Sequence, residues 1–153
     1  MADERDLPEI ARLVGALRAA GIRFQIIGMS AAMIQGVPGS TQDIDLWLDL
    51  APRQYMRAIH LARSLGAEMV RNTVVALRDD TLVKFVYAVT GLGSFDTEFR
   101  RAKLLPFHGK KVPVMPLELI RKSKEAIRRP KDLVHLEYIA ELLRLRRGKK
   151  KTK

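Results

Sequence analysis

The segment GMSAAMIQGVPGSTQDIDLWLD, residues 28–49, places two aspartates in a stretch whose apolar residues predict a buried strand. Asp43, Asp45 and Trp47 alternate with apolar residues, the period of two that is typical of a β-strand. Side chains two positions apart in a strand point to the same side, with Cα atoms about 6.5–7 Å apart. We therefore expect the two carboxylates to converge on one spot, where they repel each other unless a cation lies between them.

Hard divalent cations with oxygen ligands, Mg²⁺ or Mn²⁺, suit such a pair and often share their ligands with substrate phosphates. Upstream, Gly28 ends a predicted strand, and Ser30 is placed to cap a predicted helix over 30–36. Glycine allows close backbone approach, and a helix N-terminus offers free N–H groups to a phosphate. This combination indicates metal-assisted phosphoryl or nucleotidyl transfer, and a solvent-facing edge strand is the alternative reading of the aspartates.

The rest of the chain alternates between predicted helices and strands. Helical patterns cover 7–20, 30–36, 52–65, 95–102, 117–127 and 131–147, and strand patterns cover 23–27, 43–50, 68–77, 81–89 and 111–115. The turn at 78–80 predicts a hairpin between the third and fourth of these strands. This order predicts an α/β (α+β) fold with a mixed sheet.

The chain has 153 residues and a mass of 17.3 kDa, which suits one domain. We expect a core over 1–115, a helical element of the same domain over 116–147, and a disordered basic tail over 148–153. The absence of cysteine excludes disulfides and thiolate metal sites. No apolar run approaches the ~18 residues that span a bilayer, and the start lacks a signal-peptide pattern. We therefore expect a cytoplasmic protein without a membrane partner.

Positive charge is concentrated in the C-terminal third. Residues 1–99 hold 10 Lys and Arg against 12 Asp and Glu, whereas residues 100–153 hold 18 against 5. The second segment is a candidate surface for RNA or nucleotide phosphates. A solvated basic surface is the alternative, and we predict such an exposed helix face for Arg121, Lys122, Lys124, Arg128 and Arg129.

Residues 26–49 resemble the signature of the nucleotidyltransferase superfamily, in the branch of small bacterial proteins related to AbiEii-type toxins and minimal antitoxin-like nucleotidyltransferases. The matching positions are Gly28, Ala31, Gly36, Thr41, Asp43, Ile44, Asp45 and Leu46. The likeness covers most of residues 20–146, and Lys131-Asp132-Leu133 fits the start of the family's C-terminal helix.

The resemblance implies a nucleotidyltransferase-like mixed sheet flanked by helices. It implies transfer of a nucleoside monophosphate from an NTP to an RNA, protein or small-molecule acceptor. In this reading Asp43 and Asp45 are catalytic and bind Mg²⁺ or Mn²⁺, while Gly28, Ser30 and Thr41 contact the nucleotide. The branch also implies a protein partner of the toxin–antitoxin kind.

The chain departs from the family pattern near this site. Met29 stands for a glycine or serine, Gln35 for a histidine, and Gly39 for an arginine. The third metal carboxylate is expected on the next core strand, and alignment of VKFVYAVTGLGSF with that strand puts Lys84 there. We expect its ammonium to lie beside Asp43 and Asp45, pair with them, reach nucleotide phosphates, and damp metal-dependent transfer.

Two classes of function follow from these observations. The first is a metal-dependent nucleotidyltransferase. The second is a catalytically inactive nucleotide- or RNA-binding module, antitoxin-like or regulatory, that retains the fold. Metal dependence separates them, because a bare electrostatic RNA binder needs no metal and loses affinity steeply as salt rises.

Overall fold

One mixed β-sheet organises the computed structural model, which describes residues 7–39, 43–49 and 52–151. Its strands are β1 (Phe24–Ile27), β2 (Asp43–Leu48), β3 (Glu68–Arg71), β4 (Val74–Ala76), β5 (Leu82–Val86), β6 (Lys103–Phe107) and β7 (Lys110–Val114). They lie in the order β3-β4-β5-β2-β1-β7-β6. The central strand β2 runs parallel to β5 and antiparallel to β1, which is itself parallel to β7. The predicted α/β fold with a mixed sheet is confirmed.

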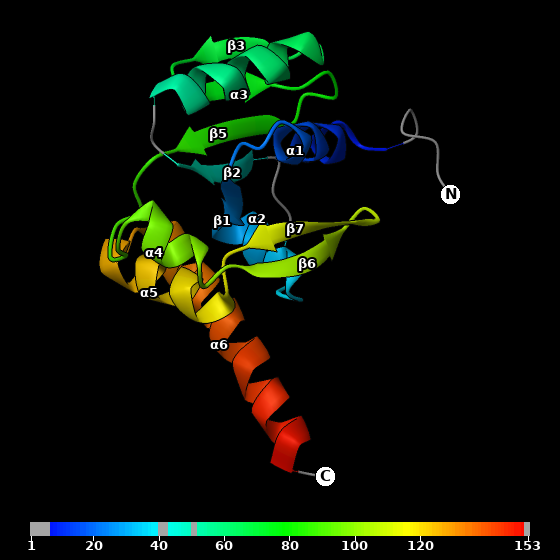
Figure 1. Cartoon of the computed structure of the whole chain (residues 1–153). Helices are drawn as coiled ribbons and strands as arrows, with labels where there is room; N and C mark the ends of the chain where they lie inside the picture. The colour runs from blue at the N-terminus through cyan, green and yellow to red at the C-terminus, as the bar shows by residue number, and fades with distance from the viewer. Residues whose placement is uncertain (1–6, 40–42, 50–51, 152–153) are drawn as a thin grey trace.

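Helices cover both faces of this sheet (Figure 1). They are α1 (Glu9–Ala19), α2 (Gly28–Ile34), α3 (Pro52–Ser64), α4 (Phe95–Phe99), α5 (Leu117–Ile127) and α6 (Pro130–Lys151). On one face α1 packs beside α3, whose Tyr55 meets Phe85 of β5 edge-on at 6.3 Å. On the other face Phe95 of α4 meets Trp47 of β2 edge-on at 5.7 Å. The second face also carries Asp43 and Asp45, which share a side of β2 with Trp47.

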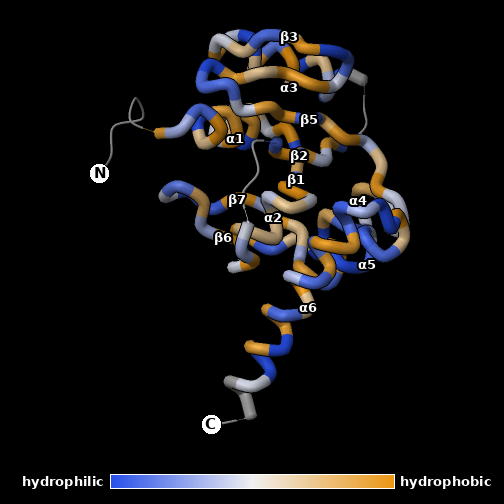
Figure 2. Tube along the Cα trace, turned by 180° about the vertical axis from the view of Figure 1, so that it is seen from behind, coloured by the Kyte–Doolittle hydropathy of each residue, from blue (hydrophilic) through white to orange (hydrophobic). Residues whose placement is uncertain are grey.

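The strand before the aspartates lies in the middle of the sheet, and all four of its residues are buried. This explains why FQII reads as a continuous buried run rather than an alternating one. On one side α1 buries Ile10, Leu13, Val14 and Leu17, the helical spacing that the sequence predicts. Apolar segments accordingly follow the strands in the centre of the molecule (Figure 2).

The predicted strand over 68–77 is corrected by the structure. Thr73 has a φ of 66°, and the turn around it divides the segment into β3 and β4. These two strands form a hairpin of their own, and β4 then pairs with β5 in the hairpin that the sequence predicts. A left-handed residue that is not glycine is uncommon, so the sequence gives no signal for this turn.

Strand β6 is absent from the elements that the sequence predicts, and it contains Pro106. Proline lacks an N–H and is tolerated at the edge of a sheet, which is where β6 lies. Helix α6 continues to Lys151 and extends away from the body (Figure 1), and the division into core, helical element and basic tail stays a prediction. In the described ranges we find no helix with the length and apolarity that crossing a bilayer requires.

Candidate active site

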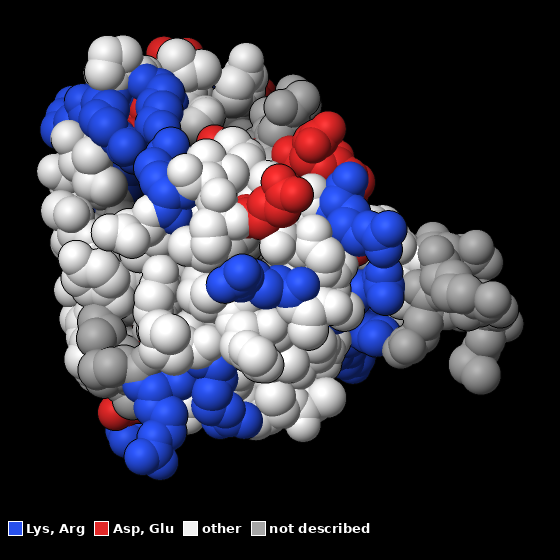
Figure 3. Space-filling view, turned by 90° about the horizontal axis from the view of Figure 1, so that it is seen from above, with Lys and Arg blue, Asp and Glu red and all other residues white. Residues whose placement is uncertain are grey.

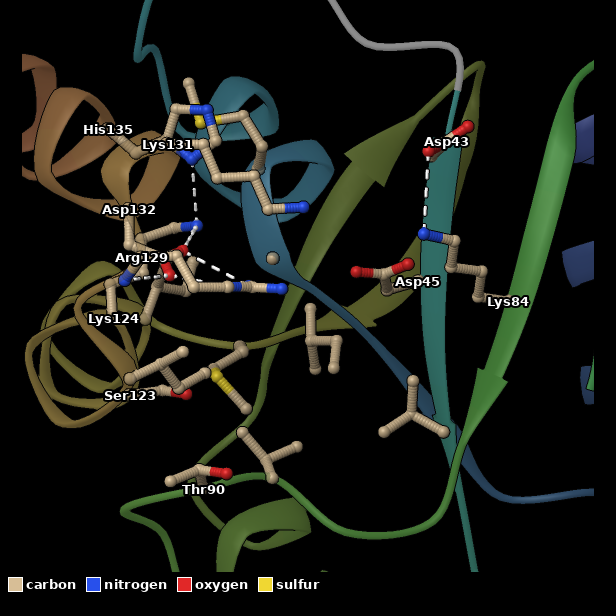
Figure 4. A pocket seen from close by; sticks show the side chains of 18 of the residues that line it. Asp43, Asp45, Lys84, Thr90, Ser123, Lys124, Arg129, Lys131, Asp132 and His135 are labelled. Carbon is tan, nitrogen blue, oxygen red and sulfur yellow. Dashed lines mark hydrogen bonds and ion pairs between the residues drawn. The ribbon is translucent and has the colours of Figure 1, made fainter.

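Two carboxylates from the first half of β2 and one ammonium group from the middle of β5 meet beside the pocket (Figure 4). In the parallel pairing of these strands, Asp45 is the register partner of Lys84. The Nζ atom of Lys84 lies 3.6 Å from Oδ2 of Asp43. The prediction that Lys84 lies beside the aspartates and forms an ion pair is therefore confirmed for Asp43.

Asp45 differs from Asp43 in its surroundings. Its Oδ1 atom is shielded from solvent and has no hydrogen-bond partner among the described residues. The pKa of this carboxyl group is raised, chiefly by burial and also by the neighbouring charge of Asp43. Lys84 opposes this change. A buried carboxylate oxygen without a partner is energetically costly, so this atom favours a cation or a proton.

Gly28 lies against the same carboxylate. Its φ of +68° is in the left-handed region, and a Cβ atom at this position would lie 3.0 Å from Oδ2 of Asp45. Any other residue would be strained there and would press on the carboxylate. The glycine also lets α2 begin directly after β1, so the backbone turns at the wall of the site.

The other two predicted nucleotide contacts are placed differently. Ser30 does not cap α2, because the helix begins two residues earlier, with Ile27 at the N-cap position. Its hydroxyl donates a hydrogen bond of 2.9 Å to the backbone oxygen of Asp43, and its side chain is buried outside the pocket lining. The cap prediction is therefore wrong, and the observed bond holds α2 against the start of β2. Thr41 lies outside the described residues.

Facing the aspartates, α5 and α6 carry a cluster built around Asp132, whose side chain is 0% exposed. This carboxylate accepts hydrogen bonds from the Arg129 backbone N at 3.0 Å and from its Nε at 2.7 Å. Lys124 Nζ lies 3.4 Å from the same carboxylate and 3.0 Å from Nδ1 of His135. The cluster therefore joins the two helices.

The pKa values in this cluster follow from burial and from these contacts. Burial alone would raise the pKa of Asp132, but the hydrogen bonds from Arg129, together with Lys124, outweigh it and hold that pKa at about 2. Burial lowers the pKa of Lys124, and Asp132 opposes this change. Burial and the charge of Lys124 lower the pKa of His135. Asp132 is thus the fixed anion that keeps two cations at the pocket wall.

A pocket of about 270 Å³ separates the aspartates from this cluster. Figure 4 shows Asp43, Asp45 and Lys84 on the sheet side, facing Arg129, in the connection between α5 and α6, and Lys131 of α6. Apolar residues line the remaining wall: Ile27, Met29, Val86, Ala88, Val89, Met115, Ile120 and Ile127. The pocket therefore has two carboxylates with Lys84 on one side, and Arg129, Lys131 and Lys124 around Asp132 on the other.

Sequence reasoning misses part of this wall. It predicts Lys124 on a solvated helix face, but this residue is only 8% exposed, so that prediction is wrong here. The structure also places His135 in the pocket lining. One feature of the sequence does indicate this cluster. Asp132 lies in the first turn after Pro130, a position where a carboxylate accepts hydrogen bonds from backbone N–H groups.

A nucleotidyltransferase-like site implies a divalent cation, and the donor set limits how many ions it fits. Among the described residues, no group of three or more histidines, aspartates or glutamates is placed to hold a metal ion. Asp43 and Asp45 supply carboxylate oxygens, one of them buried and without a partner in the described part of the chain. These residues fit one hard cation whose remaining ligands are water and phosphate, and they do not fit a pair of ions.

No protein-family model matches the sequence, and comparison with curated proteins gives no match. Solved structures do match. ANT(2″)-Ia in complex with adenylyl-2″-tobramycin has a TM-score of 0.64 and 15% identity, covering 88% of this chain and 87% of that one. The lincosamide antibiotic adenylyltransferase LnuA with lincomycin bound has a TM-score of 0.62 and 11% identity, covering 91% and 97%.

A third match is an antigenic nucleotidyltransferase-like protein from Paracoccidioides brasiliensis, with a TM-score of 0.56 and 17% identity over 87% of this chain and 74% of that one. Each comparison spans most of both chains at low identity, so what is shared is the fold. The chain has the fold of the nucleotidyltransferases, and the structure agrees with the resemblance at this level.

Proposed function

We propose that this chain is a nucleotidyltransferase that binds a nucleoside triphosphate in the pocket between the sheet and helices α5 and α6. One observation carries the proposal: the Asp43–Asp45 pair faces Arg129 and Lys131 across a pocket of about 270 Å³. A triphosphate with a bound cation presents both kinds of charge that such a pocket complements. The nucleotidyltransferase fold of the chain supports this reading.

In this proposal Asp43 and Asp45 would hold one Mg²⁺ or Mn²⁺, which would supply positive charge beside the α-phosphate of the nucleotidyl group that is transferred. The chain itself provides the contacts to the phosphates. Arg129 and Lys131 bind the phosphates that leave as pyrophosphate, and the bare backbone at Gly28 leaves room for a phosphate at the pocket wall. Thr41 is a further phosphate contact in the family pattern, whereas Ser30 lies outside the pocket lining and supports the start of β2. Positioning the reacting groups is the main catalytic contribution of such a site.

A small alcohol is the acceptor that we favour. The matched structures include ANT(2″)-Ia with an adenylylated antibiotic and LnuA with lincomycin, and this chain spans most of each. RNA and protein side chains are the other acceptors, and the basic C-terminal third supports RNA among them.

Incubation with each NTP tests the proposal. The NTP is labelled either at the α- or at the γ-phosphate, and Mg²⁺ or Mn²⁺ is supplied with total RNA, cell lysate, or a panel of aminoglycosides and lincosamides. We expect the α-label, and not the γ-label, to move to an acceptor with release of pyrophosphate. If nucleotide binds but no acceptor is labelled, transfer is rejected; if no nucleotide binds, the site assignment is rejected as well.

A second candidate is a nucleotide-binding module without turnover, with an antitoxin-like or regulatory role. The Lys84–Asp43 ion pair favours it, because one of the two candidate metal ligands is already engaged by a cation. This candidate predicts that nucleotide binds equally well in EDTA and in Mg²⁺. The nucleotidyltransferase predicts tighter binding in Mg²⁺, so one titration in each buffer separates the two.

The end of α6 provides a test of polyanion binding. On the face shown in Figure 3, Lys and Arg side chains form separate groups rather than one continuous patch.

Deleting residues 148–153 removes four lysines. Because this terminus is polar, the free energy of unfolding should stay within about 0.5 kcal/mol of that of the full chain.

We expect this truncation to weaken binding to single-stranded RNA. A plot of log K against log salt should flatten by about 0.7 for each phosphate that the shortened chain no longer neutralises, as measured by fluorescence anisotropy. An unchanged slope would show that these lysines do not touch the RNA. The substitution Lys103→Met, in β6, removes one exposed cation elsewhere and serves as a control for general charge.

A further inference from the structure

The position of Lys84 affects the binding of a divalent cation at Asp43 and Asp45. Its ammonium lies 3.6 Å from Asp43 Oδ2, while Asp45 Oδ1 has no partner among the described residues. The side chains of Lys84 and Asp43 are 34% and 45% exposed. An ion pair that is open to solvent contributes little to stability and exchanges readily. The chain itself therefore supplies a cation to one of its two candidate metal ligands, through an ion pair that can be broken.

A divalent cation bound to both aspartates would lie within a few ångströms of this ammonium. The two positive charges repel each other, and at such a distance the repulsion lowers the affinity for the ion by about tenfold or more. The Lys84 ammonium also competes directly with the ion for the Oδ2 atom of Asp43. In the nucleotide-free protein, Lys84 thus opposes the ion on two counts.

The same side chain faces the pocket that also contains Arg129 and Lys131. A phosphate bound there offers Lys84 a second anionic partner with a higher charge than one carboxylate. Moving the ammonium from Asp43 to a phosphate would end the Lys84 ion pair at the Asp43 carboxylate. The exchange needs no change of backbone, because the long lysine side chain is flexible along its four-carbon stem.

We propose that Lys84 is an exchangeable internal counterion that excludes a divalent cation from Asp43 until nucleotide phosphates draw it away. This inference rests on the proposed function for the location of the nucleotide. It states that cation and nucleotide bind as a coupled pair, each raising the affinity of the other by the same factor. The free protein binds the cation weakly, and the nucleotide-bound protein binds it tightly.

The test measures Mn²⁺ binding by electron paramagnetic resonance in the full chain, with and without a non-hydrolysable NTP analogue. Without nucleotide, Lys84→Met should bind Mn²⁺ about tenfold more tightly than the wild type, or more. The factor by which the analogue increases Mn²⁺ affinity should be smaller in this variant than in the wild type. Lys84→Gln is a second variant, in case the apolar side chain disturbs the fold as judged by circular dichroism.

Two control variants make the result specific. Lys103→Met changes the net charge by the same amount in β6 and should leave Mn²⁺ binding unchanged. Lys131→Met removes a pocket cation that does not pair with Asp43, so it should weaken binding of the analogue without tightening Mn²⁺ binding as much as Lys84→Met does.

Equal Mn²⁺ affinity in wild type and Lys84→Met would overturn the inference. An equal effect of the analogue in both proteins would overturn it too, because Lys84 would then stay on Asp43. These outcomes are distinct from failure of the proposed function. A chain that labels no acceptor but binds Mn²⁺ more tightly as Lys84→Met loses the transferase assignment and retains the counterion.

Discussion

Replacing Asp45 with asparagine should slow transfer by about two orders of magnitude while leaving the fold intact. The substitution removes one of two carboxylates that could hold the cation, and losing about 3 kcal/mol of transition-state stabilisation corresponds to about a 100-fold lower kcat/KM. Binding of the NTP should no longer depend on Mg²⁺. Asparagine has nearly the same shape, so the pocket wall and the contact with Gly28 are preserved.

The stability of this variant distinguishes a functional from a structural aspartate. Asp45 Oδ1 is buried without a partner in the described part of the chain, and Asp43 repels the charge. In metal-free buffer the free energy of unfolding should therefore be unchanged or higher by up to about 1 kcal/mol. Urea denaturation measures this, and Asp49→Asn, which breaks an ion pair with Arg23, is the comparison for loss of a carboxylate that has a partner. A clear loss of stability in Asp45→Asn alone would mark the carboxylate as structural.

Replacing Asp132 with asparagine should have the largest effect on stability. The side chain is fully buried and accepts hydrogen bonds from Arg129, while Lys124 lies 3.4 Å away. Breaking a buried ion pair leaves an uncompensated charge and costs about 3–5 kcal/mol. Because Arg129 is 53% exposed, we expect a smaller loss, about 2–3 kcal/mol.

Urea denaturation again provides the measurement, and Glu125→Gln is the matched control. Glu125 pairs with Arg121 on the surface of α5, so its loss should cost less than about 0.5 kcal/mol. An Asp132→Asn variant as stable as the wild type would contradict the role of this carboxylate in joining α5 to α6.

The dependence of stability on pH gives a second readout for the same residue. The pKa of Asp132 is about 2 in the folded protein, below the ordinary value of 3.8. A carboxyl group with a lowered pKa stabilises the fold when the pH is above its pKa in the unfolded chain. This contribution is lost as the pH falls from about 4 to about 2. The contribution amounts to about 2 kcal/mol, and the loss over this range should be smaller in Asp132→Asn.

The sheet side of the site could be predicted from the sequence because its determinants are local. Alternation places Asp43 and Asp45 on one side of β2, and Gly28 marks the turn where β1 ends. The place of Lys84 comes from the resemblance, by alignment with the family strand that carries a third carboxylate, and the register of β2 with β5 agrees with it. Only the placement of the two aspartates follows from the period of a strand.

The helix side could not be predicted in this way. Lys124 and Asp132 lie on different helices, and their contact depends on how α5 packs against α6, which no local pattern encodes. Ser30 fits the pattern of an N-cap, but Gly28 permits an earlier helix start and the serine hydroxyl bonds to β2 instead. The early break at Thr73 and the edge strand containing Pro106 likewise depend on tertiary context.

Nuclear magnetic resonance titration of the ¹⁵N-labelled 17.3-kDa chain with a non-hydrolysable NTP analogue and Mg²⁺ tests the location of the nucleotide most directly. We predict saturable shifts of the backbone amides of Gly28, Asp45, Lys84 and Lys131, the residues that surround the pocket on both sides. Shifts confined to the basic end of α6, or no saturable shifts at these four amides, would contradict the assignment of this pocket as the nucleotide site.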